Sequence, residues 1–133
     1  MTVPIEYRFS HGYEGGSKGI QVPVSLRFGK LSVELKASVD TGAAFCVFER
    51  RYAEDLGIPV ESGRFLRFLT AAGSFGAYEH EIEISTFEIE FSSFVYFAED
   101  RGFQKSVLGR VGWLDRLRVG IVDYESTILL SGY

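Results

Sequence analysis

The chain has 133 residues, of which 46% are hydrophobic, enough for one compact domain with its own core and too few for two full domains. Its formal net charge is −4, and its basic residues are scattered among acidic ones, which excludes the electrostatic footprint of a nucleic-acid-binding protein. A single cysteine excludes an intrachain disulfide and a cysteine-based zinc site within one chain. We therefore expect a single domain over residues 1–133, with no nucleic-acid partner.

The N-terminus and the apolar segments give no sign of a membrane or secretory route. No apolar run approaches the 18 residues that a membrane span requires. The first residues, MTVPIEYRFSHGYE, lack the basic start and apolar stretch of a secretory signal. These features predict a cytoplasmic protein with no membrane partner.

The clearest predicted element is a β-hairpin over residues 20–39. Apolar and polar residues alternate along 20–28 and again along 31–39, which predicts two strands that each bury one face. Gly29-Lys30 joins the two runs in an order that suits a type II′ turn. Pro23 has no N–H to donate, so we expect an edge position or a bulge there. The second strand leads directly to Asp40.

A short helix and a long hairpin are predicted next. Phe48, Tyr52 and Leu56 recur at helical spacing, and Gly57 stands where a C-terminal cap would lie. Two strand-like runs cover residues 64–84, around a turn expected at Gly73 to Gly76.

The last third of the chain continues the β pattern. The phase of the alternation changes near Ser85-Thr86, which indicates a bulge or turn. The remaining predicted elements are a buried strand at 94–98, a loop at 99–105, a helical turn at 112–117 and strands at 119–124 and 127–131. The chain is thus predicted to be mainly β, with one or two short helices.

Asp40-Thr41-Gly42 stands between two apolar segments, where a carboxylate is costly unless it is paired, neutralised or used. We expect the loss of water at the end of the strand to raise the pKa of Asp40. Thr41 can hydrogen-bond within a turn, and Gly42 allows close approach of a backbone. Two such acids held together share a proton, so that one activates water while the other protonates a substrate carbonyl. Taken alone, the tripeptide is also common in Asx turns.

Three segments resemble the retropepsin-like aspartic proteases. ASVDTGAA, residues 37–44, resembles the active-site motif of that family, and SVLGR, residues 106–110, is similar to its apolar-apolar-Gly-Arg segment. LTAAG, residues 69–73, stands with the following hairpin in the place of the family's flap. The resemblance spans about residues 20–131. It implies a closed, flattened β-barrel with one or two short helices.

The resemblance also implies that the chemistry needs two chains. There is one Asp-Thr-Gly and no Asp-Ser-Gly, so the dyad would consist of Asp40 from each subunit of a homodimer. Thr41 would reach the backbone of the other subunit, and Gly42 would bind the substrate backbone. The residues that would contact an extended peptide or protein substrate are Ala43, Ala44, Ala72, Gly73 and Ser74. No metal or other cofactor is implied.

One position departs from the retroviral pattern. In the retroviral proteases a second Asp lies two residues beyond the motif glycine and pairs with the late arginine. Here that position is Ala44, which leaves Arg110 without that partner and indicates the cellular and bacterial type of the family. The terminal segments VPIEYRF and TILLSGY are expected to be strands of the dimer interface.

The predicted function is therefore an aspartic endopeptidase that is most active at acidic to mildly acidic pH. Two alternatives stay open. One is a catalytically silent retropepsin-like module that dimerises or binds peptides. The other is a β-barrel binding domain in which Asp40 is only a turn residue.

Other reactive side chains have simpler interpretations. His11 and His80 lack a third ligand at metal spacing, so no metal site is expected. Cys46 lies in an apolar run and is expected to be a buried, inert thiol. The glycine-rich segment 12–19 lacks the Gly-Lys order of a phosphate loop and is predicted to be a flexible loop. Trp113 is expected to pack the short helix onto the core.

Overall fold

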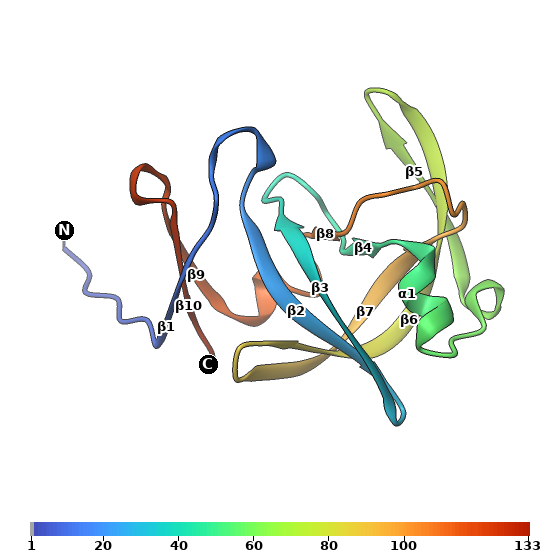
Figure 1. The fold of residues 1–133 in the computed structure, drawn as a ribbon, viewed down its shortest axis with the longest axis horizontal. Coiled ribbons are helices and arrows are strands. Elements are labelled where there is room, and N and C mark those ends of the chain that lie inside the picture. Colours follow the sequence, from blue (N-terminus) through green and yellow to red (C-terminus); the bar gives the residue numbers. More distant parts are fainter. Residues whose placement is uncertain (1) are drawn as a thin grey trace.

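The computed structural model describes residues 2–133, which form two β-sheets (Figure 1). The strands are β1 (Phe9–Gly12), β2 (Gln21–Phe28), β3 (Leu31–Val39), β4 (Val47–Phe48), β5 (Arg64–Thr70), β6 (Gly73–Thr86), β7 (Ile89–Ala98), β8 (Val107–Leu108), β9 (Arg118–Val122) and β10 (Thr127–Ser131). The helical elements are α1 (Arg50–Asp55) and the 3₁₀ turns η1 (Gly16–Lys18), η2 (Val60–Ser62), η3 (Leu114–Arg116) and η4 (Asp123–Glu125).

The predicted N-terminal hairpin is present as β2 and β3, which pair along their whole length. The φ angle is 60° at Gly29 and not positive at Lys30, which is the pattern of a type II′ turn. Pro23 precedes the short pairing of β2 with β6, so it lies where β2 has a neighbour on one side only. The hairpin thus carries the chain to Asp40 as the alternation predicts.

The larger sheet closes on itself. Its strand order is β2-β3-β8-β4-β7-β6-β5, and an additional pairing of β2 with β6 completes a ring. Strand β8 lies between β3 and β4, parallel to the first and antiparallel to the second. The predicted closed, mainly β fold is therefore confirmed, and β8 brings a late segment of the chain beside the end of β3.

The smaller sheet has the order β1-β10-β9 and packs into the same core. Ile128 and Leu130 of β10 are fully buried with residues of β2. Trp113 is fully buried as expected, and its indole N–H donates to Thr86 Oγ1 at 3.0 Å. Among residues 2–133, no helix has the length and apolar character needed to cross a membrane.

Most of VPIEYRF, which is predicted to be an interface strand, is not a strand within the single chain, because β1 begins only at Phe9. Residues 2–7 form no strand, and Val3 and Ile5 are more than half exposed. A strand needs a hydrogen-bonded neighbour, and this single chain offers none to that segment.

The long hairpin forms, but its turn lies at Ala71-Ala72 and not at Gly73 to Gly76. Thr70 pairs with Gly73, and the next three residues already belong to β6. The register is set by apolar contact across the strands, because the rings of Phe68 and Phe75 stack with centroids 5.0 Å apart. The glycines therefore lie beside the turn and not within it.

Two further predictions are refined by the structure. The turn expected near Ser85-Thr86 lies at Phe87-Glu88, where Phe87 has a φ of 55°. The strand expected at 94–98 is the end of β7, and it is buried except for Phe94, which is 55% exposed.

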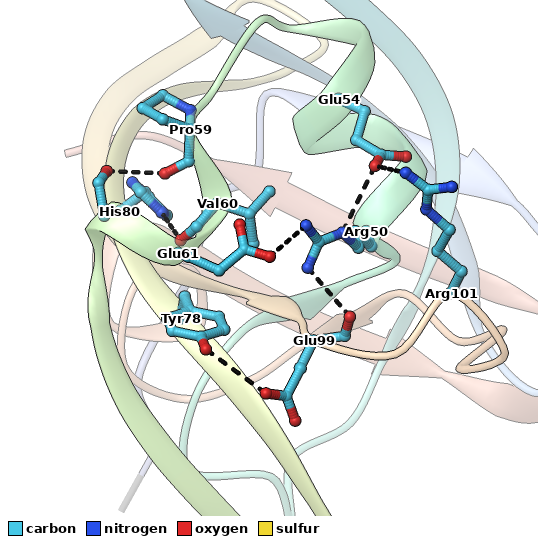
Figure 2. A network of polar contacts seen from close by, with 10 residues as sticks. Arg50, Glu54, Pro59, Val60, Glu61, Tyr78, His80, Glu99 and Arg101 are labelled. Atoms are coloured by element: carbon cyan, nitrogen blue, oxygen red, sulfur yellow. Dashed lines mark hydrogen bonds and ion pairs between the residues drawn. The ribbon is translucent and has the colours of Figure 1, made fainter.

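Arg50 fixes α1 to the base of the β5–β6 hairpin (Figure 2). Its largely buried guanidinium pairs with Glu54 at 3.4 Å and with Glu61 of η2, and it donates to the Glu99 carbonyl at 3.0 Å. A guanidinium presents several N–H donors in a rigid planar fork, so one side chain can bind several oxygens at once. The base of the hairpin is thereby held, while its tip projects from the body of the molecule (Figure 1, upper right).

Candidate active site

Asp40 follows β3 directly and begins a tight loop. Its backbone N–H donates to the Leu108 carbonyl at 3.0 Å, and its own carbonyl accepts from Ala43 at 3.1 Å. Its Oδ1 accepts the backbone N–H of Gly42 at 2.9 Å, which makes the loop an Asx turn. Asp40 is exposed in the single chain, so the expectation that its own fold strips water from it was wrong. The acid stands past the end of the strand, and only another surface can enclose it.

The segment 106–110 lies against this loop, so the structure brings the two sequence motifs together. The Arg110 N–H donates to the Ala43 carbonyl at 2.9 Å, and the Val111 N–H donates to the Ala44 carbonyl at 2.8 Å. A Cβ atom at Gly109 would lie 2.3 Å from the Phe45 carbonyl oxygen. The late motif therefore needs glycine at this position, because its backbone touches the backbone of the Asp40 loop.

A shallow depression of about 540 Å³ opens on the Thr41 side of the loop. Its lining residues are Thr41, Ala44, Arg110, Val111, Leu114 and Asp115. Among residues 2–133, the Thr41 hydroxyl makes no hydrogen bond and Arg110 forms no ion pair. The side chain of Val111, which lines the same depression, is 49% exposed. The surface beside Asp40 thus carries polar groups and an apolar side chain that its own chain leaves uncovered.

Ala72, Gly73 and Ser74 lie exposed at the turn of the β5–β6 hairpin and line neither this depression nor the groove at Asp40. An aromatic cluster below the tip joins the hairpin to Phe45, which follows the Asp40 loop. Its ring pairs are Phe68–Phe75, Phe75–Phe103, Phe45–Phe68, Phe45–Tyr96 and Phe68–Tyr96, with centroids 4.5 to 6.1 Å apart. Each such pair adds attraction beyond its buried area. No local pattern in the sequence indicates this cluster, because its members come from separate segments of the chain.

A larger groove, of about 1000 Å³, begins at Asp40 and follows the outer face of β3. Lys36 and Ser38 line it with Asp40, while the intervening Ala37 is fully buried. The alternation along residues 31–39 puts Lys36 and Ser38 on the polar face of this strand, but that face was not predicted to adjoin Asp40. The strict alternation of side chains that ends at Asp40 is the signal that could have connected this face with the acid.

The other reactive side chains have structural roles. No group of His, Cys, Asp and Glu residues in 2–133 is arranged to hold a metal ion. His80 Nε2 lies 2.8 Å from the Val60 carbonyl, and His11 packs against Phe87. Cys46 is fully buried and receives the Gly109 N–H on its sulfur at 3.4 Å. The predicted absence of reactivity at Cys46 therefore has a physical cause, which is burial.

Burial raises the pKa of the Cys46 thiol from its ordinary value to about 12. We expect the folded protein to resist thiol reagents at about pH 8, and the urea-unfolded chain to react at once. Because the folded-state pKa is raised, this thiol's contribution to stability is complete below pH 9 and is lost as the pH rises towards 12. A chromogenic thiol titration with and without urea checks this, and fast labelling of the folded protein would contradict it.

The comparisons with known proteins agree with this geometry. The family model for aspartyl protease matches residues 22–110, which include both motifs. No curated protein gives a significant match to the chain. A retropepsin-like aspartic protease from Rickettsia conorii is similar in structure, with a TM-score of 0.67 and 20% identity over 92% of this chain and 99% of that one.

EIAV protease, solved in complex with the inhibitor HBY-793, is also similar, with a TM-score of 0.56 and 18% identity over 71% of this chain and 84% of that one. At these identities the two structural likenesses concern the fold. The family model covers most of the chain, including the Asp40 motif at 37–44 and the segment 106–110 that lies against it. The chain therefore belongs to the aspartyl protease family, as a peptide-bond hydrolase with the retropepsin-like fold.

Proposed function

We propose that the protein cleaves peptide bonds as a homodimer in which Asp40 of each subunit supplies half of the catalytic dyad, with residues 1–133 acting as one catalytic domain. The observation that carries the proposal is a single Asp-Thr-Gly loop that leaves its acid exposed at the end of β3. One carboxylate cannot both take a proton from water and give one to the substrate carbonyl. A second copy, related by a two-fold axis, supplies the missing acid.

In the proposed mechanism the two Asp40 side chains hold one water and share one proton. The ionised Asp40 takes a proton from the water, whose oxygen attacks the scissile carbonyl carbon. The protonated Asp40 gives its proton to the carbonyl oxygen, which forms a neutral tetrahedral diol. The Asp40 that took the water proton then gives it to the amide nitrogen, while the other Asp40 takes a proton from a diol hydroxyl. The C–N bond breaks, the amine leaves, a carboxylic acid forms, and the pair again holds one proton. The pair keeps one proton over acidic to mildly acidic pH, where activity is expected.

The neighbouring groups have roles that fit their contacts. The Thr41 hydroxyl, which has no hydrogen bond to any residue in 2–133, would donate to the partner's backbone across the two-fold axis. The Gly42 N–H is already held by Asp40, so its carbonyl is the group that would accept a substrate N–H. Ala43 and Ala44 would line the floor of the site. The hairpin tip at Ala72, Gly73 and Ser74 would close over an extended peptide by strand addition.

Exposed apolar surface on the single chain supports dimerisation. Val3, Ile5 and Tyr133 are between 58% and 87% exposed and surround a hollow of about 710 Å³ beside β9. Uncovered apolar side chains gathered in this way are typical of interfaces between proteins. The terminal segments would thus gain in the dimer the neighbours that they lack in one chain.

Subunit mixing tests the shared dyad. Wild-type protein re-equilibrated with an equal amount of the Asp40→Asn variant should keep about half the activity of the same wild-type amount alone, because mixed dimers are inactive. The measurement is cleavage of an unstructured protein over about pH 4 to 7. Mixing with Asp100→Asn, which alters an acid outside the loop, should give the sum of the two separate activities. Full activity in the Asp40→Asn mixture would mean that each subunit acts alone.

A further inference from the structure

The groove beside Asp40 has two walls that belong to neighbouring strands. On one wall, Lys36, Ser38 and Asp40 take alternate positions along β3 and its end, so they face the same way. The other wall includes Lys105, just before β8. The parallel register of Ser38 with Val107 places these walls side by side. The groove is therefore continuous with the catalytic loop and is not a separate cavity.

The charge of the groove is opposite to that of the protein. Five basic and three acidic side chains line it, although the whole chain has a formal charge of −4. Two of the three acids are already engaged, since Glu49 pairs with Arg51 at 3.6 Å and Glu54 pairs with Arg101. The third is Asp40 itself. The positive charge of the other basic side chains therefore exceeds the single negative charge of Asp40 and is not balanced within the groove.

Lys36 and Lys105 carry this unbalanced charge. Neither forms an ion pair with any acid in residues 2–133, whereas Lys18 on the rim is paired with Glu14 at 2.8 Å. Lys36 lies near enough to Glu14 to help lower the pKa of that carboxyl, after the larger effect of Lys18, but does not reach it. Two ammonium groups therefore face the groove with capacity for further acceptors.

The distance from Lys36 to Asp40 along β3 indicates how far from the cleaved bond a substrate side chain would lie beside this charge. Lys36 precedes Asp40 by four residues in extended backbone, which is about 13 Å. An extended peptide spans the same distance in about four residues. A side chain within about four residues of the cleaved bond can thus reach the two lysines. In a two-fold dimer one groove would lie on each side of that bond.

We propose that Lys36 and Lys105 make this groove a subsite for acidic side chains, so that the enzyme prefers substrates with Asp or Glu within about four residues of the cleaved bond. The inference rests on the proposed function and names its substrate class. A peptide suits the groove better than a nucleic acid does, because single carboxylates can lie beside the lysines. An unbroken row of phosphates would also meet Asp40.

Paired peptides test the preference. One peptide that the protein cleaves is made with Glu and with Lys at the third and fourth positions on either side of the bond. At low salt the wild type should show roughly fivefold higher kcat/KM for each Lys replaced by Glu, the size expected of an exposed ion pair. The difference should shrink as salt is added. Equal cleavage of the two peptides would overturn the proposal.

Charge reversal assigns the effect to the groove. The double variant Lys36→Glu, Lys105→Glu should prefer the Lys peptide. The control is Lys30→Glu, which changes an exposed charge in the β2–β3 turn outside the groove and should keep the wild-type preference. A loss of preference in Lys30→Glu as large as in the double variant would show a general charge effect and would contradict a groove-specific subsite.

A binding experiment separates this inference from the proposed function. If the wild type cleaves neither peptide, the dyad proposal fails, and the groove is tested alone with fluorescent Glu and Lys peptides on Asp40→Asn protein. Tighter binding of the Glu peptide, lost in the double charge reversal, would support the subsite. Equal binding would overturn it. Displacement of the Glu peptide by a single-stranded oligonucleotide at lower concentrations would replace it with a polyanion site.

Discussion

The Asp40→Asn variant should lose roughly 10²- to 10⁴-fold in kcat/KM and remain folded. Asn keeps an Oδ1 that can accept the Gly42 N–H, so the Asx turn survives the change. What is lost is the carboxyl group that would take a proton from water in one subunit and give one to the substrate carbonyl in the other. Peptide cleavage assays over about pH 4 to 7, with circular dichroism of each variant, measure the two effects separately.

The chain offers a closely matched control for this experiment. Asp100 Oδ1 accepts the backbone N–H of Gly102 at 2.7 Å, which repeats the Asx geometry of Asp40 and Gly42. Asp100→Asn removes the same charge from the same type of turn and should leave kcat/KM unchanged. Substantial activity in Asp40→Asn, or equal losses in both variants, would show that Asp40 is not the catalytic acid.

The Gly109→Ala variant should be destabilised by roughly 2–4 kcal/mol and should lose most of its activity. The new Cβ atom would lie 2.3 Å from the Phe45 carbonyl oxygen and 2.9 Å from that of Ala43. These are backbone atoms, so neither can turn away as the end of a side chain would. The Asp40 loop must shift instead, and a dyad tolerates little displacement. Urea unfolding and peptide cleavage measure the two losses.

Gly12→Ala is the matched control for the backbone clash. A Cβ atom there would have its nearest neighbour, the Ser126 carbonyl oxygen, at 3.9 Å, which is ordinary contact. We expect its unfolding midpoint to stay close to that of the wild type. If Gly109→Ala were as stable as Gly12→Ala, the two motifs would not be in the close backbone contact that the structure describes.

Local sequence signals predicted the β2–β3 hairpin and the turn at Asp40 well. Alternation fixed the faces of β2 and β3, and the Gly29-Lys30 order fixed their turn. Gly57 ended α1 as a left-handed cap with a φ of 71°. These features depend on residues close together in the chain, where side-chain spacing and backbone preference act directly.

Features that depend on distant segments were not predictable in this way. The turn of the long hairpin was misplaced because cross-strand packing of Phe68 on Phe75, and not the glycines, decides its register. The exposure of Asp40 was missed because apolar neighbours in sequence need not cover a residue beyond a strand end. The basic groove was also not predictable from local patterns, because Lys36 and Lys105 are far apart in the sequence. The pairing of β3 with β8 brings them to the same groove.

The position of β8 has a consequence for biosynthesis. This strand of two residues, Val107–Leu108, comes from the last quarter of the chain yet lies between β3 and β4. While a ribosome is still making the first hundred residues, the acid already exists but the backbone donors and acceptors that hold its loop do not. Long-range pairings of this kind form late in folding. A nascent chain therefore carries Asp40, the proposed catalytic acid, before the segment that holds its loop has been made, so that proteolysis would have to wait for the synthesis and pairing of β8.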